Sequence, residues 1–421
     1  MNTLNFQTFG CKLNSYETEA METLCEKEGI ENVTIINSCA VTKEAVTKAK
    51  KFIRRSQKEN PSKKIVVTGC AAQIEPDTFD RMDEVDFVIG NEEKLSAITW
   101  NKLNKTLIKN DPFQRINVTD IMGAKRIDPL RINKLAKRSR AYVQIQNGCD
   151  HRCTFCIIPF GRGNSRSVSV ADILDQIKKL VDNGFKEIVL TGVDITSWGT
   201  DLDSNPGLGS LIKKILSNVP DLPRLRLSSI DSIEVDQELI EVIVNEKRFM
   251  PHLHLSLQSG DDLILKRMRR RHSREDAINF CKEIQKKRPE ITFGADFIVG
   301  FPTETQQMFD NSLELVNSCN LTWLHVFPFS ARAGTPAAKM PQVNRKDIKK
   351  RALRLRELGQ KRKTQHLDFA LGKKHSVLIE GNGRGRTETF AEVSVGSKLE
   401  VGSIQELVTL YHDGSKLLWS E

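Results

Sequence analysis

The sequence has no long hydrophobic run, few aromatic residues and no recognisable leader. No apolar stretch in its 421 residues approaches the ~18 that a membrane-spanning helix needs. The first residues, MNTLNFQTFGCK, lack the basic and apolar regions of a secretory signal. Because disulfides belong to oxidising compartments, we expect the nine cysteines to be reduced thiols or metal ligands in the cytoplasm. A membrane protein and a secreted disulfide scaffold are both disfavoured.

Acidic residues are outnumbered by basic ones, which leaves a net charge of +10. Such a balance favours an acidic partner, and nucleic acid is the most obvious one. A generally basic, lysine-rich proteome would give the same excess, so charge alone does not decide. The length allows two or three domains, each with its own core.

Residues 141–166 carry the clearest chemistry. An alternating apolar run predicts a strand, which Asn147-Gly148 ends, and a polar loop with Cys149, Cys153 and Cys156 follows. Three thiolates so close together can converge on one soft metal centre. No fourth cysteine or suitably spaced histidine follows to close a zinc site, so the set favours an iron–sulfur cluster with one open iron. Three unrelated buried thiols are the alternative.

Three apolar runs in the N-terminal part each end in a small residue and a cysteine: Cys11, Cys39 and Cys70. Helical stretches at residues 17–27 and 43–58 intervene, so the pattern predicts a parallel α/β sheet. Ligands of such sheets lie beyond the carboxyl ends of the strands, where these thiols would meet. The alternative, that they are small buried residues ending strands, stays open. Residues 111–140, irregular and basic, are predicted to form an interdomain linker.

Six β/α units follow and predict an open, partial TIM-type barrel. The expected strands are residues 141–146, 187–190, 224–228, 252–258, 293–299 and 322–329. The expected helices are residues 170–183, 209–218, 236–245, 274–287 and 305–319. Polar and glycine residues beyond the strands could bind ribose or carboxylate groups, although ordinary turn chemistry would look alike. These candidates are Thr191, Gly192, Asp194, Ser229 and Gln258.

A long basic helix at residues 344–374 precedes short strands with turn glycines. They predict a small β domain, a five-stranded barrel of the oligonucleotide-binding kind. Lys373, Lys374, Arg384 and Arg386 are its candidate phosphate contacts. Because aromatic side chains are few, backbone contacts should outweigh base stacking. The basic run at residues 266–274 could contact phosphate or form a solvated helix end, and a domain that only caps the barrel is the alternative to RNA binding.

Several strings resemble one family. C-x3-C-x2-C after a strand is the signature of radical S-adenosylmethionine (SAM) enzymes, and QNGCDHRCTFCIIPFGRGNSRS resembles their methylthiotransferase branch. TFGCKLNSYETE, NSCAVT and TGCAAQ resemble the N-terminal cysteine blocks of that branch, the first in particular those of the subgroup acting on threonylcarbamoyladenosine in tRNA. FIVGFPTET and FPFSARAGTPA resemble later superfamily motifs, and EGNGRGRTETFAEV resembles the TRAM domain of RNA-modifying enzymes.

The resemblance implies an α/β protein of three parts. They are an N-terminal parallel-sheet domain (residues 1–125), a partial (β/α)6 TIM-type radical-SAM barrel (126–365) and a TRAM-like β-barrel (366–421). It also implies SAM and two 4Fe–4S clusters, a radical-SAM cluster on Cys149, Cys153 and Cys156 and an auxiliary one on Cys11, Cys39 and Cys70. Phe155 would pack on the SAM adenine, Gly300 and Pro302 would flank it, and the region of Asp194 would bind the amino group. No catalytic residue beyond the cluster ligands is implied.

The implied activity is methylthiolation of carbon 2 of N6-threonylcarbamoyladenosine, next to the anticodon in a tRNA stem-loop. It requires an external electron donor and a sulfur donor. Enzymes acting on isopentenyl-adenosine in tRNA or on an aspartate of a ribosomal protein share this machinery. An iron–sulfur RNA-binding protein without catalysis is the alternative of another class. The segment between Cys11 and Cys39 is shorter than the family leads us to expect, so the sheet could have lost a strand or compressed a loop there.

Overall fold

The computed structural model describes residues 4–109, 111–127 and 139–420, which form two compact units. The first contains the described residues up to 127 together with 146–168 and 330–335. The second contains residues 139–145, 169–329 and 336–420. These units do not test the functional division into three domains, which stays a prediction with the bounds 1–125, 126–365 and 366–421. Among the described helices, none has the length and apolar character that crossing a bilayer requires.

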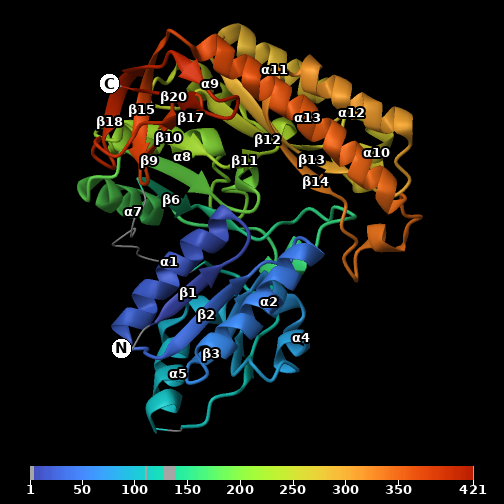
Figure 1. The fold of residues 1–421 in the computed structure, drawn as a ribbon. Coiled ribbons are helices and arrows are strands. Elements are labelled where there is room, and N and C mark those ends of the chain that lie inside the picture. Colours follow the sequence, from blue (N-terminus) through green and yellow to red (C-terminus); the bar gives the residue numbers. More distant parts are fainter. Residues whose placement is uncertain (1–3, 110, 128–138, 421) are drawn as a thin grey trace. The chain divides into compact units, whose positions relative to one another are not determined.

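The first unit is built on a parallel sheet, as predicted, and the sheet has five strands where the sequence indicated three (Figure 1). Helices α1 and α5 contribute to the core on one face, and α2 and α4 to the core on the other. The strands, in sheet order, are β1 (Asn5–Thr8), β2 (Val33–Ser38), β3 (Lys64–Gly69), β4 (Phe87–Ile89) and β5 (Ile116–Asn117). The helices are α1 (Lys12–Lys27), α2 (Lys43–Glu59), α3 (Cys70–Ile74), α4 (Pro76–Asp80) and α5 (Ala97–Lys109).

The short segment before Cys39 has a topological consequence. Residues 28–32, all described, form no strand, and β1 pairs directly with β2. The β1–α1–β2 and β2–α2–β3 connections both move in the same direction along the sheet, but α1 and α2 lie on opposite faces of it. The two connections therefore have opposite handedness, so one of them is left-handed, which is rare for parallel strands. The linker predicted at 111–140 needs correction, because β5 lies within it and pairs with β4. Residues 128–138 of that stretch lie outside the described residues.

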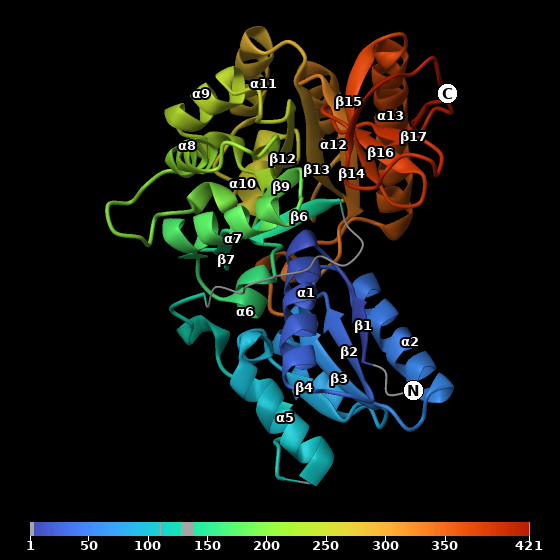
Figure 2. The same cartoon turned by 90° about the vertical axis from the view of Figure 1, so that its left-hand side faces the viewer.

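The second unit begins with the predicted partial barrel of parallel strands (Figure 2). Two sheets, β10-β9-β6 and β11-β12-β13-β14, supply its wall. The strands are β6 (Arg140–Gln144), β9 (Glu187–Thr191), β10 (Arg224–Leu227), β11 (Ser229–Ile230), β12 (His252–Gln258), β13 (Thr292–Val299) and β14 (Leu321–Pro328). The helices are α7 (Val170–Asp182), α8 (Leu208–Asn218), α9 (Gln237–Asn245), α11 (Arg274–Lys287) and α12 (Gln306–Ser318), with one that the sequence did not predict, α10 (Asp262–Met268).

The C-terminal part is a long helix followed by a small β-barrel. Helix α13 (Arg345–Ala370) packs against β14, and the strands after it enclose a core that includes Val377, Val393 and Leu417. Six strands are hydrogen-bonded in the order β18-β15-β16-β17-β20-β19, one more than predicted. They are β15 (Lys374–Glu380), β16 (Arg384–Thr387), β17 (Glu392–Ser394), β18 (Ile404–Val408), β19 (Tyr411–His412) and β20 (Leu417–Leu418).

A buried ionic network joins the β-barrel to the amino ends of the parallel strands. Glu187, at the start of β9, is fully buried and accepts a hydrogen bond of 2.9 Å from Arg226 Nε. Arg226 also donates to the carbonyls of Thr387 and Glu388, at 2.9 Å each. The next aromatic ring, Phe390, stacks on His252 and lies beneath the guanidinium of Arg226. The C-terminal barrel therefore does cap the parallel barrel, whatever else it binds.

Candidate functional site

The three N-terminal cysteines lie at the carboxyl edge of the first sheet, as predicted. Cys11 precedes α1 and is exposed, Cys39 follows β2 and is 7% exposed, and Cys70 opens α3 directly after β3 and is 3% exposed. Burial raises the pKa of the Cys39 thiol to about 12, and the negative charges of the Cys70 and Cys11 thiolates add to the rise. The three sulfurs are thus close enough to interact, in a place where a cation would stabilise all of them as thiolates.

Glycine at position 10 makes room for this arrangement. Gly10 has a φ of +105°, which L side chains rarely adopt. A Cβ at this position would lie 2.9 Å from Sγ of Cys39. A side chain here would therefore push against the thiol itself, which gives the FGC sequence a physical reason.

A buried ion cluster lies beside these cysteines. Glu17, fully buried, is bound by Lys94 Nζ at 2.7 Å and by both terminal nitrogens of Arg162 at 2.7 and 2.9 Å. Burial opposes ionisation of Glu17, but the two cations outweigh it and lower its pKa to about 2. Burial lowers the pKa of Lys94, although Glu17 and the Cys70 thiolate both favour its charged form. With Lys94 charged, one carboxylate and two cations leave a net positive charge. The cluster therefore favours a negatively charged group at the cysteines.

The second cysteine set lies on a loop that local hydrogen bonds hold in shape. Cys149, Cys153 and Cys156 are partly exposed. The Cys149 amide donates to the carbonyl of Gly163 at 3.1 Å, and the Cys156 amide to that of Cys153 at 3.0 Å. Arg152 binds the Cys149 carbonyl at 2.7 Å and the Asn164 side chain at 2.6 Å. The loop thus presents three thiols on a constrained backbone, as an iron–sulfur ligand set requires.

Both cysteine sets belong to the first compact unit and share one arginine. Arg162, at the end of α6 (Ile158–Arg162), donates to Asn147 at the entry of the second loop at 3.1 Å. Through Nη2 it donates to Asn14, three residues after Cys11, at 2.6 Å. Asn91 donates to the carbonyl of Gly161 at 2.5 Å and lies 3.7 Å from Sγ of Cys70. The segment after Cys156 is therefore anchored against the N-terminal cysteines.

Sequence reasoning missed Glu17, Lys94, Asn91 and Arg162 as functional residues. Glu17 and Arg162 lie inside the strings that carry the family resemblance, and this was the one available signal. Lys94 carries no signal, because a single lysine near an acidic pair predicts a solvent-exposed residue.

Gly148 gives the first testable prediction. Its φ is +76°, and a Cβ there would collide with the carbonyl oxygen of Asn164. We expect Gly148→Ala to distort the loop and to lower the iron content of purified protein by roughly half, because one of two cysteine sets is affected. Iron and sulfide analysis measures this, with Gly184→Ala as control, since Gly184 also has a positive φ but nothing within 4 Å of its Cβ position. An unchanged iron content in Gly148→Ala would contradict the prediction.

The candidate SAM residues of the second unit lie near the carboxyl ends of its strands. Thr191 ends β9, and Gly192 and Asp194 lie one and three residues beyond it. Ser229 lies two residues after β10 and begins β11, and Gln258 ends β12 with a φ of +65°. Gly300 and Pro302 follow β13, and a Cβ on Gly300 would collide with Ile348 of α13, which gives this glycine a packing reason as well. Phe155 is half-buried in the cysteine loop of the first unit. Contacts of these residues with SAM stay a prediction.

The four candidate RNA contacts differ in availability. Lys373, Lys374 and Arg384 are exposed, with the Lys373 ammonium over the ring of Phe369 and Lys374 beside Glu406. Arg386 is 19% exposed and pairs with Glu380 and Glu392. The basic run at 266–274 is largely engaged within the protein: Arg270 binds Asp231 at 2.7 Å, and Arg274 binds the carbonyl of Gly260 at 3.0 Å. Lys266 and Arg269, at the end of α10, are exposed, so the run is in part the solvated helix end that the sequence allowed, and phosphate contact by these two residues stays a prediction.

Comparison with known proteins decides the family. The Radical SAM superfamily model matches residues 143–316, and the model of the Uncharacterized protein family UPF0004 matches residues 3–90. Threonylcarbamoyladenosine tRNA methylthiotransferase MtaB of Rickettsia prowazekii (strain Madrid E) is 48% identical over 397 residues, which cover 94% of this chain and 92% of that protein. The chain belongs to the radical SAM methylthiotransferase family. It is therefore an enzyme of that family, and all six candidate cysteine ligands lie within the two matched regions.

Two further relatives and one solved structure are also similar to this methylthiotransferase. MtaB of Aquifex aeolicus (strain VF5) is 33% identical, over 95% of this chain and 98% of that one. The tRNA-2-methylthio-N(6)-dimethylallyladenosine synthase of Ehrlichia canis (strain Jake) is 32% identical, over 90% and 88%. The radical S-adenosylmethionine methyltransferase TsrM from Kitasatospora setae superposes with a TM-score of 0.56 at 13% identity, over 80% and 77%. The last comparison shows similarity of fold alone.

Proposed function

We propose that this chain is a tRNA methylthiotransferase that adds a methylthio group to carbon 2 of N6-threonylcarbamoyladenosine beside the anticodon. The 48% identity to a protein of that name, against 32% to a dimethylallyladenosine synthase, supports this choice of base. The TFGCKLNSYETE string supports it independently. The substrate is the anticodon stem-loop of tRNA, and the enzyme works in the cytoplasm.

Two 4Fe–4S clusters and SAM fit the donor sets. Cys11, Cys39 and Cys70 would hold the auxiliary cluster, and Cys149, Cys153 and Cys156 the radical-SAM cluster, each with one iron left open. When bound, the clusters supply the electron for SAM cleavage and a site for the transferred sulfur. The net positive charge of Glu17, Lys94 and Arg162 suits the first set, because a thiolate-bound cluster is negatively charged. An external electron donor and a sulfur donor complete the reaction.

The shared arginine is the observation that carries the proposal. Arg162 binds Asn147, which enters one cysteine loop, and Asn14, which follows the first cysteine of the other set. An enzyme that makes a radical at one centre and supplies sulfur from another must hold the two at a fixed separation. An RNA-binding protein with independent structural clusters has no such need.

Basic residues of the C-terminal barrel are proposed to hold the tRNA backbone. Lys373, Lys374 and Arg384 are exposed cations, able to neutralise phosphates. Contacts of this kind bind without reading sequence, so the choice of nucleotide must come from elsewhere in the protein.

Nucleoside analysis of total tRNA tests the proposal. We expect cells without this gene to lose the methylthio form of threonylcarbamoyladenosine, measured by mass spectrometry, and to regain it with the wild-type gene. A variant lacking Cys149, Cys153 and Cys156 should fail to restore it. Loss of the methylthio-isopentenyl form instead would change the substrate and keep the enzyme class. No change in either nucleoside would overturn the tRNA proposal in favour of a ribosomal-protein target or a non-catalytic protein.

A further inference from the structure

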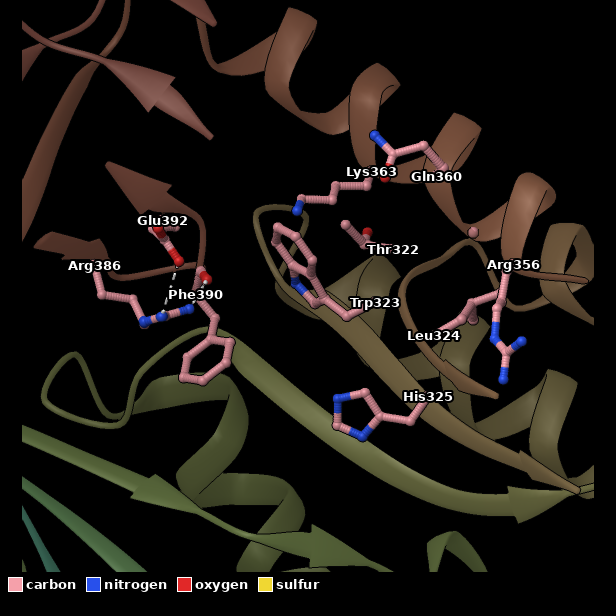
Figure 3. A pocket seen from close by; sticks show the side chains of 11 residues that line it. Thr322, Trp323, Leu324, His325, Arg356, Gln360, Lys363, Arg386, Phe390 and Glu392 are labelled. Carbon is pink, nitrogen blue, oxygen red and sulfur yellow. Dashed lines mark hydrogen bonds and ion pairs between the residues drawn. The ribbon is translucent and has the colours of Figure 1, made fainter. Parts of the chain in front are cut away.

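A cavity of about 350 Å³ lies within the second unit, between the edge strand β14, helix α13 and strands β16 and β17 of the small barrel. Figure 3 shows its side chains: rings and cations project into one space from three elements distant in the chain. Its aromatic and cationic lining residues are Trp323, His325, Arg356, Lys363, Arg386 and Phe390. Its size falls at the lower end of the range for small-ligand pockets.

The rings of the cavity are held in place. Trp323 and His325 lie two residues apart on β14 and so face the same side of the strand. The indole of Trp323 meets His366 edge-on at 5.4 Å. Phe390 stacks on His252 at 4.5 Å and has Arg226 at 5.3 Å from its centroid. A flat ligand would thus meet surfaces that need little ordering on binding.

One polar group of the wall has no partner within the protein. Nε1 of Trp323 is buried and makes no hydrogen bond with any residue that the structure describes. A buried donor without an acceptor is costly, and few remain in native structures. Because Nε1 is closed to solvent, a ligand in the cavity does not reach it in this geometry, and ligand binding depends instead on the rings and charges of the wall.

The charge of the cavity favours an anion. Lys363 is half-buried and has no ion pair among the described residues. Arg356 donates to the carbonyl of Val326 at 3.1 Å through one nitrogen and keeps further donors. The positive charge of Arg386 is balanced by an ion pair with Glu392 at 3.5 Å. Two uncompensated cations therefore accompany the flat rings.

His325 adds a directed hydrogen-bonding group. Its Nδ1 lies 3.1 Å from Oδ1 of Asp296, and Nε2 of His254 lies 2.9 Å from the same oxygen. The shared carboxylate fixes the orientation of the His325 ring and leaves its Nε2 for another partner. The His325 side chain is 61% exposed, so a ligand can reach it.

We propose that this cavity binds one unpaired nucleotide of the RNA substrate, at a position other than the base that is modified. Aromatic stacking with cations for phosphate is how proteins bind unpaired nucleotides, and the fixed, exposed imidazole of His325 can bind a base edge or a 2′-hydroxyl. Reactions of TIM-type barrels take place at the carboxyl ends of the strands. Trp323 lies near the amino end of β14, roughly 16 Å from its last residue, Pro328, so a base stacked there is not the reacting one. The inference rests on the proposed function.

Binding of a stem-loop RNA to the full-length holoenzyme tests the cavity. Trp323→Ala is expected to weaken binding roughly 5- to 150-fold, the range for one lost base stack, and Trp323→Phe to recover part of it. Lys363→Gln should weaken binding and reduce the salt dependence by about one counterion. Lys361→Gln is the matched control, because Lys361 is exposed and two residues away on the same helix, where it faces another side. Equal affinity of all four variants and the wild type would overturn the inference.

Loop nucleotides replaced one at a time by abasic residues then locate the contact. We expect one position beside the modified adenosine to weaken binding to the wild type and to have no further effect in Trp323→Ala. If the modified adenosine itself is that position, the cavity holds the reacting base and the inference is wrong. Methylthiolation by the wild type, measured in the same preparations, separates the two proposals. If the wild type is active but the variants bind RNA as tightly as it does, the proposed role of the cavity is refuted and the proposed reaction stands. If the variants bind RNA more weakly but the wild type has no methylthiolation activity, the proposed reaction is refuted and the role of the cavity stands.

Discussion

Replacing Glu17 by glutamine is expected to destabilise the apo protein by about 3–5 kcal/mol, the cost of breaking a buried ion pair at one partner. Glu17 is bound by Lys94 and by Arg162, both almost completely buried. Glutamine keeps the shape but leaves two cations in a low-dielectric interior without an anion. Urea unfolding of wild type and variant, followed by circular dichroism, measures the loss. Because Arg162 also holds Asn14 and Asn147, both cysteine sets should bind less iron.

A second variant separates charge from packing. The wild-type cluster has a net charge of one, Glu17→Gln raises it to two, and Glu17→Gln with Lys94→Met returns it to one. We expect the double variant to recover part of the stability lost in the single one, as a double-mutant cycle would report. A double variant no more stable than Glu17→Gln would show that lost hydrogen bonds, not unpaired charge, cause the effect.

The same cluster predicts a pH dependence. The pKa of Glu17 is lowered from 4.5 to about 2 in the folded protein, so its ionised form stabilises the fold above pH about 4.5. That contribution should fade as the pH falls from about 4.5 and should be lost below pH about 2, where Glu17 is protonated in folded and unfolded chains alike. The stability difference between wild type and Glu17→Gln should therefore shrink in acid. A difference independent of pH would contradict this.

Periodicity and chain order were enough to predict most of the fold. Short β-rich runs placed β9, β10, β12, β13 and β14 to within a few residues, because parallel strands that are buried on both faces are continuous apolar runs. Cysteines after strands 1, 2 and 3 met at one edge for the same topological reason. Helix α10 was missed, since its apolar residues merge into the basic run at residues 266–274. The sixth strand of the small barrel was missed because β19 and β20 are two residues each.

Charged side chains were the part that sequence reasoning could not place. Arg270 and Arg386 were counted as available to phosphate, yet Arg270 binds Asp231 and Arg386 pairs with Glu380. Partners of that kind lie far apart in the chain, and nothing in a local pattern marks them. The cavity at Trp323 was missed for the same reason, because its walls come from β14, α13 and the small barrel. A low aromatic content argued against base stacking, but three rings in one place suffice for it.

Removing the N-terminal cysteines is expected to separate SAM cleavage from sulfur transfer. In the variant Cys11→Ala, Cys39→Ala, Cys70→Ala, reconstituted iron should fall from about eight to about four atoms per chain, because each trio is proposed to bind a four-iron cluster. The loop of Cys149, Cys153 and Cys156 keeps its own backbone hydrogen bonds, to Gly163 and within the loop. Reductive formation of 5′-deoxyadenosine from SAM should therefore persist, while methylthiolated nucleoside disappears.

Cys25→Ala is the matched control for that experiment, since Cys25 lies on the buried face of α1, where burial raises its thiol pKa and no ligand role is expected. It should retain about eight iron atoms and full product formation. The reciprocal variant, without Cys149, Cys153 and Cys156, should keep about four iron atoms and form no deoxyadenosine. Were the N-terminal variant to keep all its iron, these thiols would only end their strands, and the sulfur would have to come from elsewhere. Were it to lose deoxyadenosine formation as well, the two sets would depend on each other through Arg162, and Glu17→Gln should then show the same double loss.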